Sequence, residues 1–231
     1  MSAIRILHVD DEPDIREVVD IALGLNPEFE VRSCASGMEA LVTAAEWAPF
    51  LILLDVMMPG MDGPTTLAHL RKDPRTAEIP VLFMTARAQT REIEHFISLG
   101  AQGVISKPFD PMTLAVLVRS HLQGIRLAKL RGVFMRRAQS DAELLTAFRT
   151  ARAREADPAA MTRVRDIAHG LAGAAGLFGL DQIGNDAAAL EEAVRATVDG
   201  GGTQKDVSAA LDRLMASVAE EARAPAALLV A

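Results

Sequence analysis

Two strongly apolar segments that each end in an aspartate constrain the fold of this chain more than any other feature. IRILHVD covers residues 4–10 and PFLILLD covers residues 49–55. A short and continuous apolar run of this kind is typical of a strand that is buried on both faces. Such strands belong to parallel sheets that carry helices on both sides.

The alternation of strand and helix patterns continues to about residue 122. The predicted strands cover residues 4–10, 29–34, 49–55, 79–85 and 103–106. Each is followed by a segment with helical spacing, and the last of these helices runs from Pro111 to about Leu122. Five strands and five helices in alternation predict an α/β fold with a doubly wound, five-stranded parallel sheet.

Polar residues gather at the ends of these predicted strands. They are Asp10, Asp11, Asp55, Thr85 and Lys107. Each alone has an ordinary explanation as a helix cap or a solvated lysine, but parallel strands bring all five to one edge of the sheet. Clustered carboxylates repel one another unless a cation joins them, and hard oxygen ligands favour Mg²⁺. A hydroxyl and an ammonium beside Mg²⁺ indicate chemistry on a phosphoryl group.

Four segments in this half resemble a response-regulator receiver domain, which has a flavodoxin-like fold. They are HVDDEPDIREVV, LLDVMMPGMDG, VLFMTA and ISKPF, and the resemblance covers about residues 3–123. It implies that Asp55 accepts a phosphoryl group. It also implies that Asp11 and Asp55 hold Mg²⁺ through their side chains, Asp10 partly through water, and Met57 through its backbone carbonyl.

The same resemblance assigns roles around the phosphoryl group. Lys107 would pair with it, and the hydroxyl of Thr85 would bind it as the switch, while the small Ala86 leaves it accessible. The bond between Lys107 and Pro108 is often cis in this family. Val104 stands where the family often has an aromatic switch residue, so any allosteric signalling would use another surface.

The second half contains helix patterns only. Predicted helices cover residues 124–139, a segment begun by the capping box of Ser140 and Glu143, a segment from Asp157-Pro158 toward Phe178, residues 180–198, and a final helix marked by Val207 to Val218. We expect a four-helix bundle with one extra helix leading into it. The predicted domains are residues 1–123 and 124–225, with a frayed tail at 226–231. Gly124 and Gly132 permit a hinge, but the last helix of the first domain could also continue through them.

The segment IAHGLAGAAGLFGL, residues 167–180, surrounds a histidine with small residues. Helical spacing places the apolar side chains on one face and His169 to the side of it. Gly170, Gly173 and Gly176 each cost about 1 kcal/mol relative to alanine inside a helix. Two explanations remain open, which are close helix–helix approach through the glycines, or a nucleophilic imidazole cleared for a partner's active site.

This helical half also resembles a histidine phosphotransfer (HPt) domain over about residues 126–221. The resemblance rests on AHGLAG, AAGLFGL and ALEEAV. It implies that His169 carries the phosphoryl group and that Gly173 lets a receiver approach. Ala172 stands where the family has a lysine, and Arg165, one turn before His169, could replace that cation.

Charge and cysteine content bear on nucleic-acid binding and on the compartment of the protein. Residues 1–123 hold 10 Lys+Arg and 17 Asp+Glu, while residues 124–231 hold 14 of each, so neither half has the strong basic surface typical of nucleic-acid binding. The single cysteine, Cys34, excludes an intrachain disulfide and fits a reducing compartment. Charges at Arg5 and Asp10 argue against a signal peptide, and the apolar runs are too short to span a bilayer, so we expect a cytoplasmic protein.

Three hypotheses follow, and none is an enzyme that turns over a substrate. The first is a phosphorelay protein in which Asp55 and His169 exchange phosphoryl groups with each other or with sensor histidine kinases, receivers or HPt proteins. The second is a phosphorylation-switched binding module whose bundle docks a kinase or receiver without being phosphorylated. The third, a DNA-binding output regulator, is disfavoured by the neutral second half.

Overall fold

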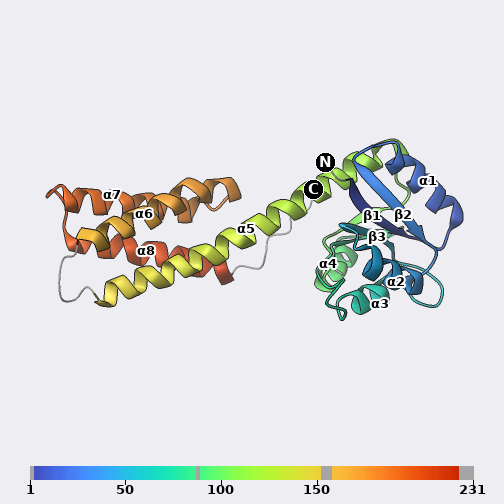
Figure 1. Ribbon diagram of the computed structural model, residues 1–231, viewed down its shortest axis with the longest axis horizontal. Coiled ribbons are helices and arrows are strands. Elements are labelled where there is room, and N and C mark those ends of the chain that lie inside the picture. Colours follow the sequence, from blue (N-terminus) through green and yellow to red (C-terminus); the bar gives the residue numbers. More distant parts are fainter. Residues whose placement is uncertain (1–2, 87–88, 152–157, 224–231) are drawn as a thin grey trace. The chain divides into compact units, whose positions relative to one another are not determined.

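The computed structural model describes residues 3–86, 89–151 and 158–223. The chain forms two compact units that divide between Ile125 and Arg126, and each unit is described by itself below (Figure 1). This division is close to the predicted boundary at residue 123.

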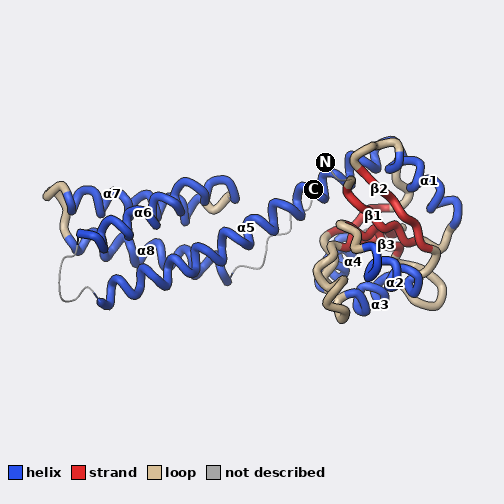
Figure 2. The backbone as a smooth tube through the Cα atoms, in the orientation of Figure 1, coloured by secondary structure: helices blue, strands red, loops and turns tan. Residues whose placement is uncertain are grey.

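The first unit contains the five-stranded parallel sheet that the apolar runs predict (Figure 2). Its strands are β1 (Ile4–Val9), β2 (Phe29–Cys34), β3 (Leu51–Asp55), β4 (Val81–Thr85) and β5 (Gly103–Ser106). They lie in the order β2-β1-β3-β4-β5, and every neighbouring pair is parallel. The order in which the strands are added to the sheet reverses between β1 and β3. In doubly wound folds, ligands bind in the crevice at this point.

Helices cover both faces of this sheet. They are α1 (Pro13–Gly24), α2 (Gly37–Trp47), α3 (Gly63–Leu70), α4 (Thr90–Ser98) and the first part of α5 (Pro111–Ala151). One hydrophobic core lies between the sheet and α2, α3 and α4, and the other lies between the sheet and α1 and α5. Because both faces are covered, all five residues of β3 are buried, as the continuous apolar pattern predicts.

The structure differs from the predicted elements at α5. It is one helix of 41 residues, so it neither ends near Leu122 nor restarts at Ser140. The capping box of Ser140 and Glu143 is therefore wrong, because Ser140 lies in the interior of a helix. No proline interrupts the segment after residue 111, and the cost of Gly124 and Gly132, about 1 kcal/mol each, is too small to end it.

All regular elements of the second unit are helices in its described residues. Besides α5 it contains α6 (Pro158–Ala175), the short 3₁₀ helix η1 (Gly176–Phe178), α7 (Asp181–Val198) and α8 (Gln204–Arg223). Figure 1 shows these helices side by side. The bundle is therefore built from the four long helices α5, α6, α7 and α8. The predicted extra helix at residues 124–139 is not a separate element, because it is part of α5.

The core of this unit follows the predicted apolar faces. On α6 the buried side chains are Met161, Val164, Ala168, Leu171 and Ala175, and on α7 they include Ile183, Ala187, Leu190 and Val194. Phe178 is partly buried and its ring lies 5.2 Å from that of Phe134 on α5. The predicted cap Asp157 lies outside the described residues. No described helix is long and apolar enough to cross a membrane.

Candidate phosphoryl-accepting sites

The ends of the strands bring three of the predicted residues of the first unit, Asp10, Asp55 and Lys107, into contact. Asp10 follows β1, Asp55 ends β3, Thr85 ends β4, and Lys107 follows β5. The backbone N–H of Lys107 donates to the carbonyl of Thr85 at 2.7 Å, which anchors the end of β5 to β4. The Lys107–Pro108 peptide bond is cis.

A single ammonium group joins two of the carboxylates. Nζ of Lys107 lies 2.6 Å from Oδ2 of Asp10 and 2.5 Å from Oδ1 of Asp55. Asp10 is fully buried and Asp55 is 6% exposed. Two buried acids that share one cation form a strongly polar pocket in which electrostatic interactions are weakly screened.

Burial and ion pairing act against each other on these groups. Burial raises the pKa of the Asp55 carboxyl above its ordinary value, even though Lys107 opposes that rise. Burial also pulls the pKa of Lys107 down, but the hydrogen bonds to Asp10 and Asp55 outweigh it, so the Lys107 pKa is raised. The pocket thus keeps its lysine charged and leaves Asp55 short of compensating positive charge.

Each carboxylate oxygen of Asp10 and Asp55 accepts a hydrogen bond from the protein. Oδ2 of Asp55 accepts the backbone N–H of Met57 at 2.7 Å, and Oδ1 of Asp10 accepts that of Glu12 at 3.0 Å. Arg16 donates to the carbonyl oxygens of Asp10 and Asp11 and so holds that turn in place. In the part of the chain that the structure describes, no three His, Cys, Asp or Glu side chains form a ready metal site. The ammonium of Lys107 nevertheless lies between two carboxylates, and carboxylate oxygens are the kind of ligand that Mg²⁺ prefers.

The loop after β3 approaches Asp55 closely through a glycine. A Cβ atom added at Gly63 would lie 2.3 Å from the carbonyl oxygen of Asp55, a distance that real Cβ atoms do not show. Gly63 also donates its N–H to the carbonyl of Val56. The glycine of the MDG segment is therefore required by packing, because it lets α3 begin against the end of β3.

The residues expected to couple phosphorylation to conformation differ in burial. Thr85 is 5% exposed, and Ala86 beside it is exposed, as a site open to a phosphoryl group requires. Val104 is partly buried and packs against the core beneath α2, α3 and α4.

His8 is a buried polar residue that sequence reasoning missed. It lies on β1 two residues before Asp10, its side chain has no exposure, and neither ring nitrogen has a hydrogen-bond partner among the described residues. Burial lowers the pKa of His8 to about 4, although Asp10, with Oδ2 3.9 Å from Nε2, favours the protonated form. The apolar spacing of IRILHV gave no signal, because His8 occupies a position that an apolar residue would normally fill.

In the second unit, His169 projects from the surface of α6. Its side chain is 77% exposed, whereas its neighbour Ala168 is fully buried in the bundle core. The predicted sideways placement of His169 therefore agrees with the structure. Ala172, in the place of the family's lysine, is partly buried and packs against the same core.

A carboxylate on the neighbouring helix holds the imidazole ring. Nδ1 of His169 lies 3.2 Å from both carboxylate oxygens of Glu191 on α7. When Nδ1 carries the proton and donates it to Glu191, the lone pair of Nε2 is free for attack. Sequence reasoning did not assign Glu191 to the site, because the contact depends on the register of α6 against α7 across 22 positions.

The glycines around His169 face open space. A Cβ atom added at Gly170, Gly173 or Gly176 would meet nothing within 4 Å. The close contact between α6 and α7 lies elsewhere, at Gly184, where an added Cβ would meet the Cβ of Ala175 at 3.4 Å. The first of the two open explanations, helix packing through these three glycines, is therefore wrong within the described residues.

Two protein families match the chain in succession. The response regulator receiver domain matches residues 6–119, and the Hpt domain matches residues 129–223. The chain is a receiver–Hpt fusion. It belongs to two-component signalling, in which both families are signalling modules.

Similar proteins match the receiver domain. Response regulator Rre1 of Synechocystis sp. is 40% identical over 119 residues, which are 52% of this chain and 52% of that protein. The DNA-binding dual master transcriptional regulator RpaA of the same organism is 38% identical over 52% of this chain and 49% of its own length. Chemotaxis protein CheY4 of Vibrio cholerae matches 52% of this chain and 98% of its own with 30% identity and a TM-score of 0.49. The matched part therefore spans about half the length of the two curated relatives.

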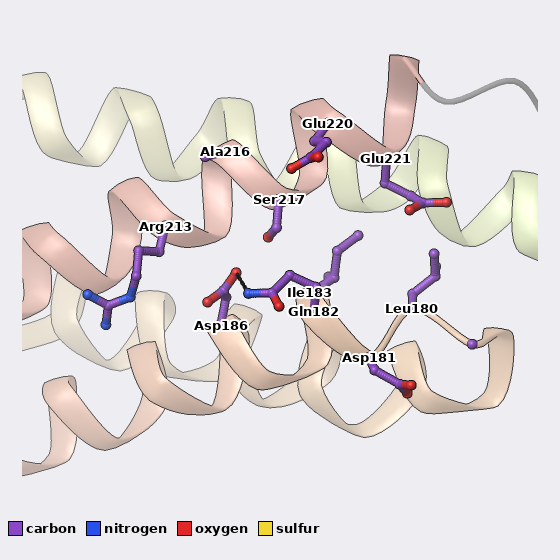
Figure 3. A pocket seen from close by; sticks show the side chains of 11 residues that line it. Leu180, Asp181, Gln182, Ile183, Asp186, Arg213, Ala216, Ser217, Glu220 and Glu221 are labelled. Atoms are coloured by element: carbon purple, nitrogen blue, oxygen red, sulfur yellow. Dashed lines mark hydrogen bonds between the residues drawn. The ribbon is translucent and has the colours of Figure 1, made fainter.

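One pocket of the Hpt domain does not include His169 in its lining. It lies between α7 and α8, has a volume of about 680 Å³, and is lined by the buried Asp186 and Ser217 and by exposed charged side chains. Figure 3 shows Gln182 donating to Asp186 inside it, at 3.0 Å. Since Glu191 is also absent from its lining, this pocket is separate from the exposed imidazole.

Proposed function

We propose that this receiver–Hpt fusion is a phosphorelay protein in which Asp55 accepts a phosphoryl group and His169 carries it in a second step. The observation that carries the proposal is the exposed imidazole of His169, which Glu191 holds by Nδ1 on a surface cleared by glycines. Among the described residues, no side chain packs where these glycines leave space. A partner's active site could close over Nε2 without meeting a side chain at those positions.

In the receiver, Asp55 would be the nucleophile. One carboxylate oxygen forms a bond to phosphorus, while the bond from phosphorus to the donor's leaving group breaks. Asp10, Asp11, Asp55 and the carbonyl of Met57 would hold Mg²⁺, which when bound neutralises charge on the phosphoryl oxygens. Lys107 would move its ammonium onto a phosphoryl oxygen, since it already lies 2.5 Å from Asp55.

In the Hpt domain, Nε2 of His169 would attack phosphorus of an aspartyl phosphate. The bond from Nε2 to phosphorus forms, the bond to the aspartate oxygen breaks, and the carboxylate is released. The ring gains positive charge in this step, and Glu191 would stabilise it through the hydrogen bond to Nδ1–H before that proton leaves. Glu191 would thus act as a positioning residue.

Ala172 favours a second candidate function. Without the family's lysine, a phosphohistidine would lack one compensating cation. In this alternative the receiver is a phosphorylation switch, and the bundle docks a kinase or another receiver without being phosphorylated. Either function predicts sensor kinases, receivers or Hpt proteins as partners at a cytoplasmic location, with no role for nucleic acid or a membrane.

Complementary variants separate the two candidates. Full-length His169→Gln protein, labelled on Asp55 with radioactive acetyl phosphate and Mg²⁺, is mixed with unlabelled Asp55→Asn protein, which retains His169. We expect acid-labile, base-stable label to appear on the Asp55→Asn protein, and no such label when both proteins carry His169→Gln. His69→Gln, at another exposed histidine, is the matched control and should transfer normally.

The reverse result would identify the alternative. If no base-stable label forms in any mixture, including one with the wild-type protein as acceptor, His169 is not part of a relay between copies of this chain. A partner whose affinity then changes on labelling of Asp55, and equally so in the His169→Gln protein, would support the binding module.

A further inference from the structure

Two arginines lie one helical turn from the pair of His169 and Glu191, one on each helix. Arg165 precedes His169 by four residues on α6, and Arg195 follows Glu191 by four residues on α7. Residues four apart lie on the same face of a helix. Both arginines line the same hollow between α6 and α7. His169 and Glu191 are not part of its lining, but they lie one helical turn further along the same two helices, where they contact each other.

This hollow can receive a small polar group. Its volume is about 150 Å³, far more than the roughly 10–15 Å³ that a single water molecule requires. The hydroxyl-bearing Thr162, the two arginines, the buried Met161 and the exposed Asp199 are among the residues that line it. Two cations therefore face one anion in this lining.

Neither arginine is committed to a strong partner. Arg165 pairs with the adjacent Asp166 at 3.1 Å, with side chains 50% and 63% exposed. Arg195 pairs with Glu192 one turn earlier, and both side chains are 62% exposed. Exposed ion pairs of this kind contribute little, so either guanidinium can exchange its carboxylate for a more highly charged anion.

A phosphoryl group on His169 would create a need for such cations. It carries about −1.5 to −2 charges near neutral pH. Glu191 already places a carboxylate against the ring, and Ala172 supplies no charge. The three arginines of α6 and α7 are Arg163, Arg165 and Arg195, and helical spacing turns Arg163 about 160° away from Arg165 around α6.

We propose that Arg165 and Arg195 together form a phosphoryl-binding clamp that replaces the family's lysine. The clamp rests on the proposed function, since it binds the phosphoryl group that His169 would carry. Each guanidinium presents a planar fork of N–H donors that matches two phosphoryl oxygens. The pair would hold the dianionic form of the phosphoryl group and slow its loss from Nε2.

The test uses full-length protein in an Asp55→Asn background, so that Asp55 cannot accept the phosphoryl group, and an Asp55→Asn, His169→Gln protein gives the signal from the other histidines. Phosphoramidate is the probe. Nε2 of His169 bonds to phosphorus, the bond from phosphorus to nitrogen breaks, and ammonia leaves with a proton. The variants are Arg165→Gln, Arg195→Gln, the double variant and the matched control Arg163→Gln. Phosphorus NMR then gives the amount of phosphohistidine and the pH at which its phosphoryl group titrates.

We expect each single variant to lower the equilibrium amount of phosphohistidine about threefold and the double variant about tenfold, within the range for partly exposed ion pairs. The phosphoryl group should titrate at a higher pH in both single variants, because a nearby cation favours its dianion. The control should match the parent protein, and Arg195→Lys should restore part of the effect.

Two contrary outcomes have different meanings. If phosphohistidine forms normally and titrates at the same pH in the double variant, the clamp is wrong while the proposed function stands. If neither the parent nor any variant forms phosphohistidine, while an Hpt protein of known activity does so under the same conditions, the proposed role of His169 fails, and the clamp fails with it.

Discussion

The two candidate phosphoryl acceptors of this protein differ most in how much of the site each domain supplies. Asp55 is buried and lies 2.5 Å from a lysine that also holds Asp10. His169 is an exposed ring held by one carboxylate, with glycines beside it. Under the proposed function, the receiver would supply the pocket in which the reaction occurs, and the Hpt domain would supply an accessible nucleophile that enters a partner's pocket.

This difference has a physical basis. A nucleophile that must accept a phosphoryl group from another protein has to remain accessible, so it cannot be enclosed by its own domain. Stabilisation of a transferring phosphoryl group works best in a preorganised pocket that excludes water. One pocket can therefore support transfer of the phosphoryl group both to and from a histidine. Variants of the two domains would test whether the receiver supplies the pocket and the Hpt domain the accessible nucleophile.

The largest effect should come from removing the lysine of the buried site. In Lys107→Met the carboxylates of Asp10 and Asp55 would face each other without a cation, and breaking a buried ion pair costs about 3 kcal/mol or more. We expect the free energy of unfolding of the receiver to fall by about that amount. Urea titration followed by fluorescence of Trp47, the single tryptophan of the chain, measures it.

Unfolding in the presence of Mg²⁺ tests the predicted metal site with the same variant. If the predicted metal site lies between these carboxylates, millimolar Mg²⁺ should stabilise Lys107→Met more than the wild-type protein. Lys72→Met, at an exposed lysine, controls for the loss of a charge. Equal stabilisation by Mg²⁺ in all three proteins would contradict the placement of the metal site.

These sites also show how far sequence reasoning reaches. Asp10, Asp55 and Lys107 could be predicted together because the ends of parallel strands must meet, which is a consequence of topology. Glu191 could not, because its contact with His169 depends on how α6 and α7 are aligned. Continuation of α5 through Gly124 and Gly132 was one of two open alternatives, but the predicted helix start at Ser140 was wrong, because a capping pattern has only local meaning and packing overrides it.

A smaller effect is expected from His8, which contrasts with the exposed histidines. Its pKa is lowered from 6.5 to about 4 by burial, so the unfolded chain binds a proton that the native protein does not. Its contribution to stability is therefore complete above about pH 6.5 and is lost as the pH falls toward 4, by about 3 kcal/mol at most.

Substitution of His8 by leucine should remove this part of the pH dependence. Urea titrations between pH 7 and 4.5 in the absence of Mg²⁺ would show a shallower loss of stability for His8→Leu than for the wild type. His69→Gln, at an exposed histidine of the same domain, should keep the wild-type slope. An unchanged slope in His8→Leu would mean that His8 is protonated in the native protein.

The smallest change in stability, and the most informative about the open surface, is expected at Gly173. An added Cβ meets nothing within 4 Å, so Gly173→Ala should stabilise α6 by about 1 kcal/mol through helix propensity alone. The same methyl group would stand where a receiver must approach His169, so phosphoryl transfer from labelled receiver should slow several-fold.

Circular dichroism during thermal unfolding and the labelled-phosphate assay measure the two effects. Gly124→Ala provides the matched control, because an added Cβ there also meets nothing within 4 Å. It should stabilise α5 by a similar amount and leave transfer unchanged. A gain in stability with slower transfer only at Gly173 would mean that this glycine is kept for access to His169 at the expense of stability. If transfer were equally fast in both variants, the cleared surface would not be the approach route of the receiver.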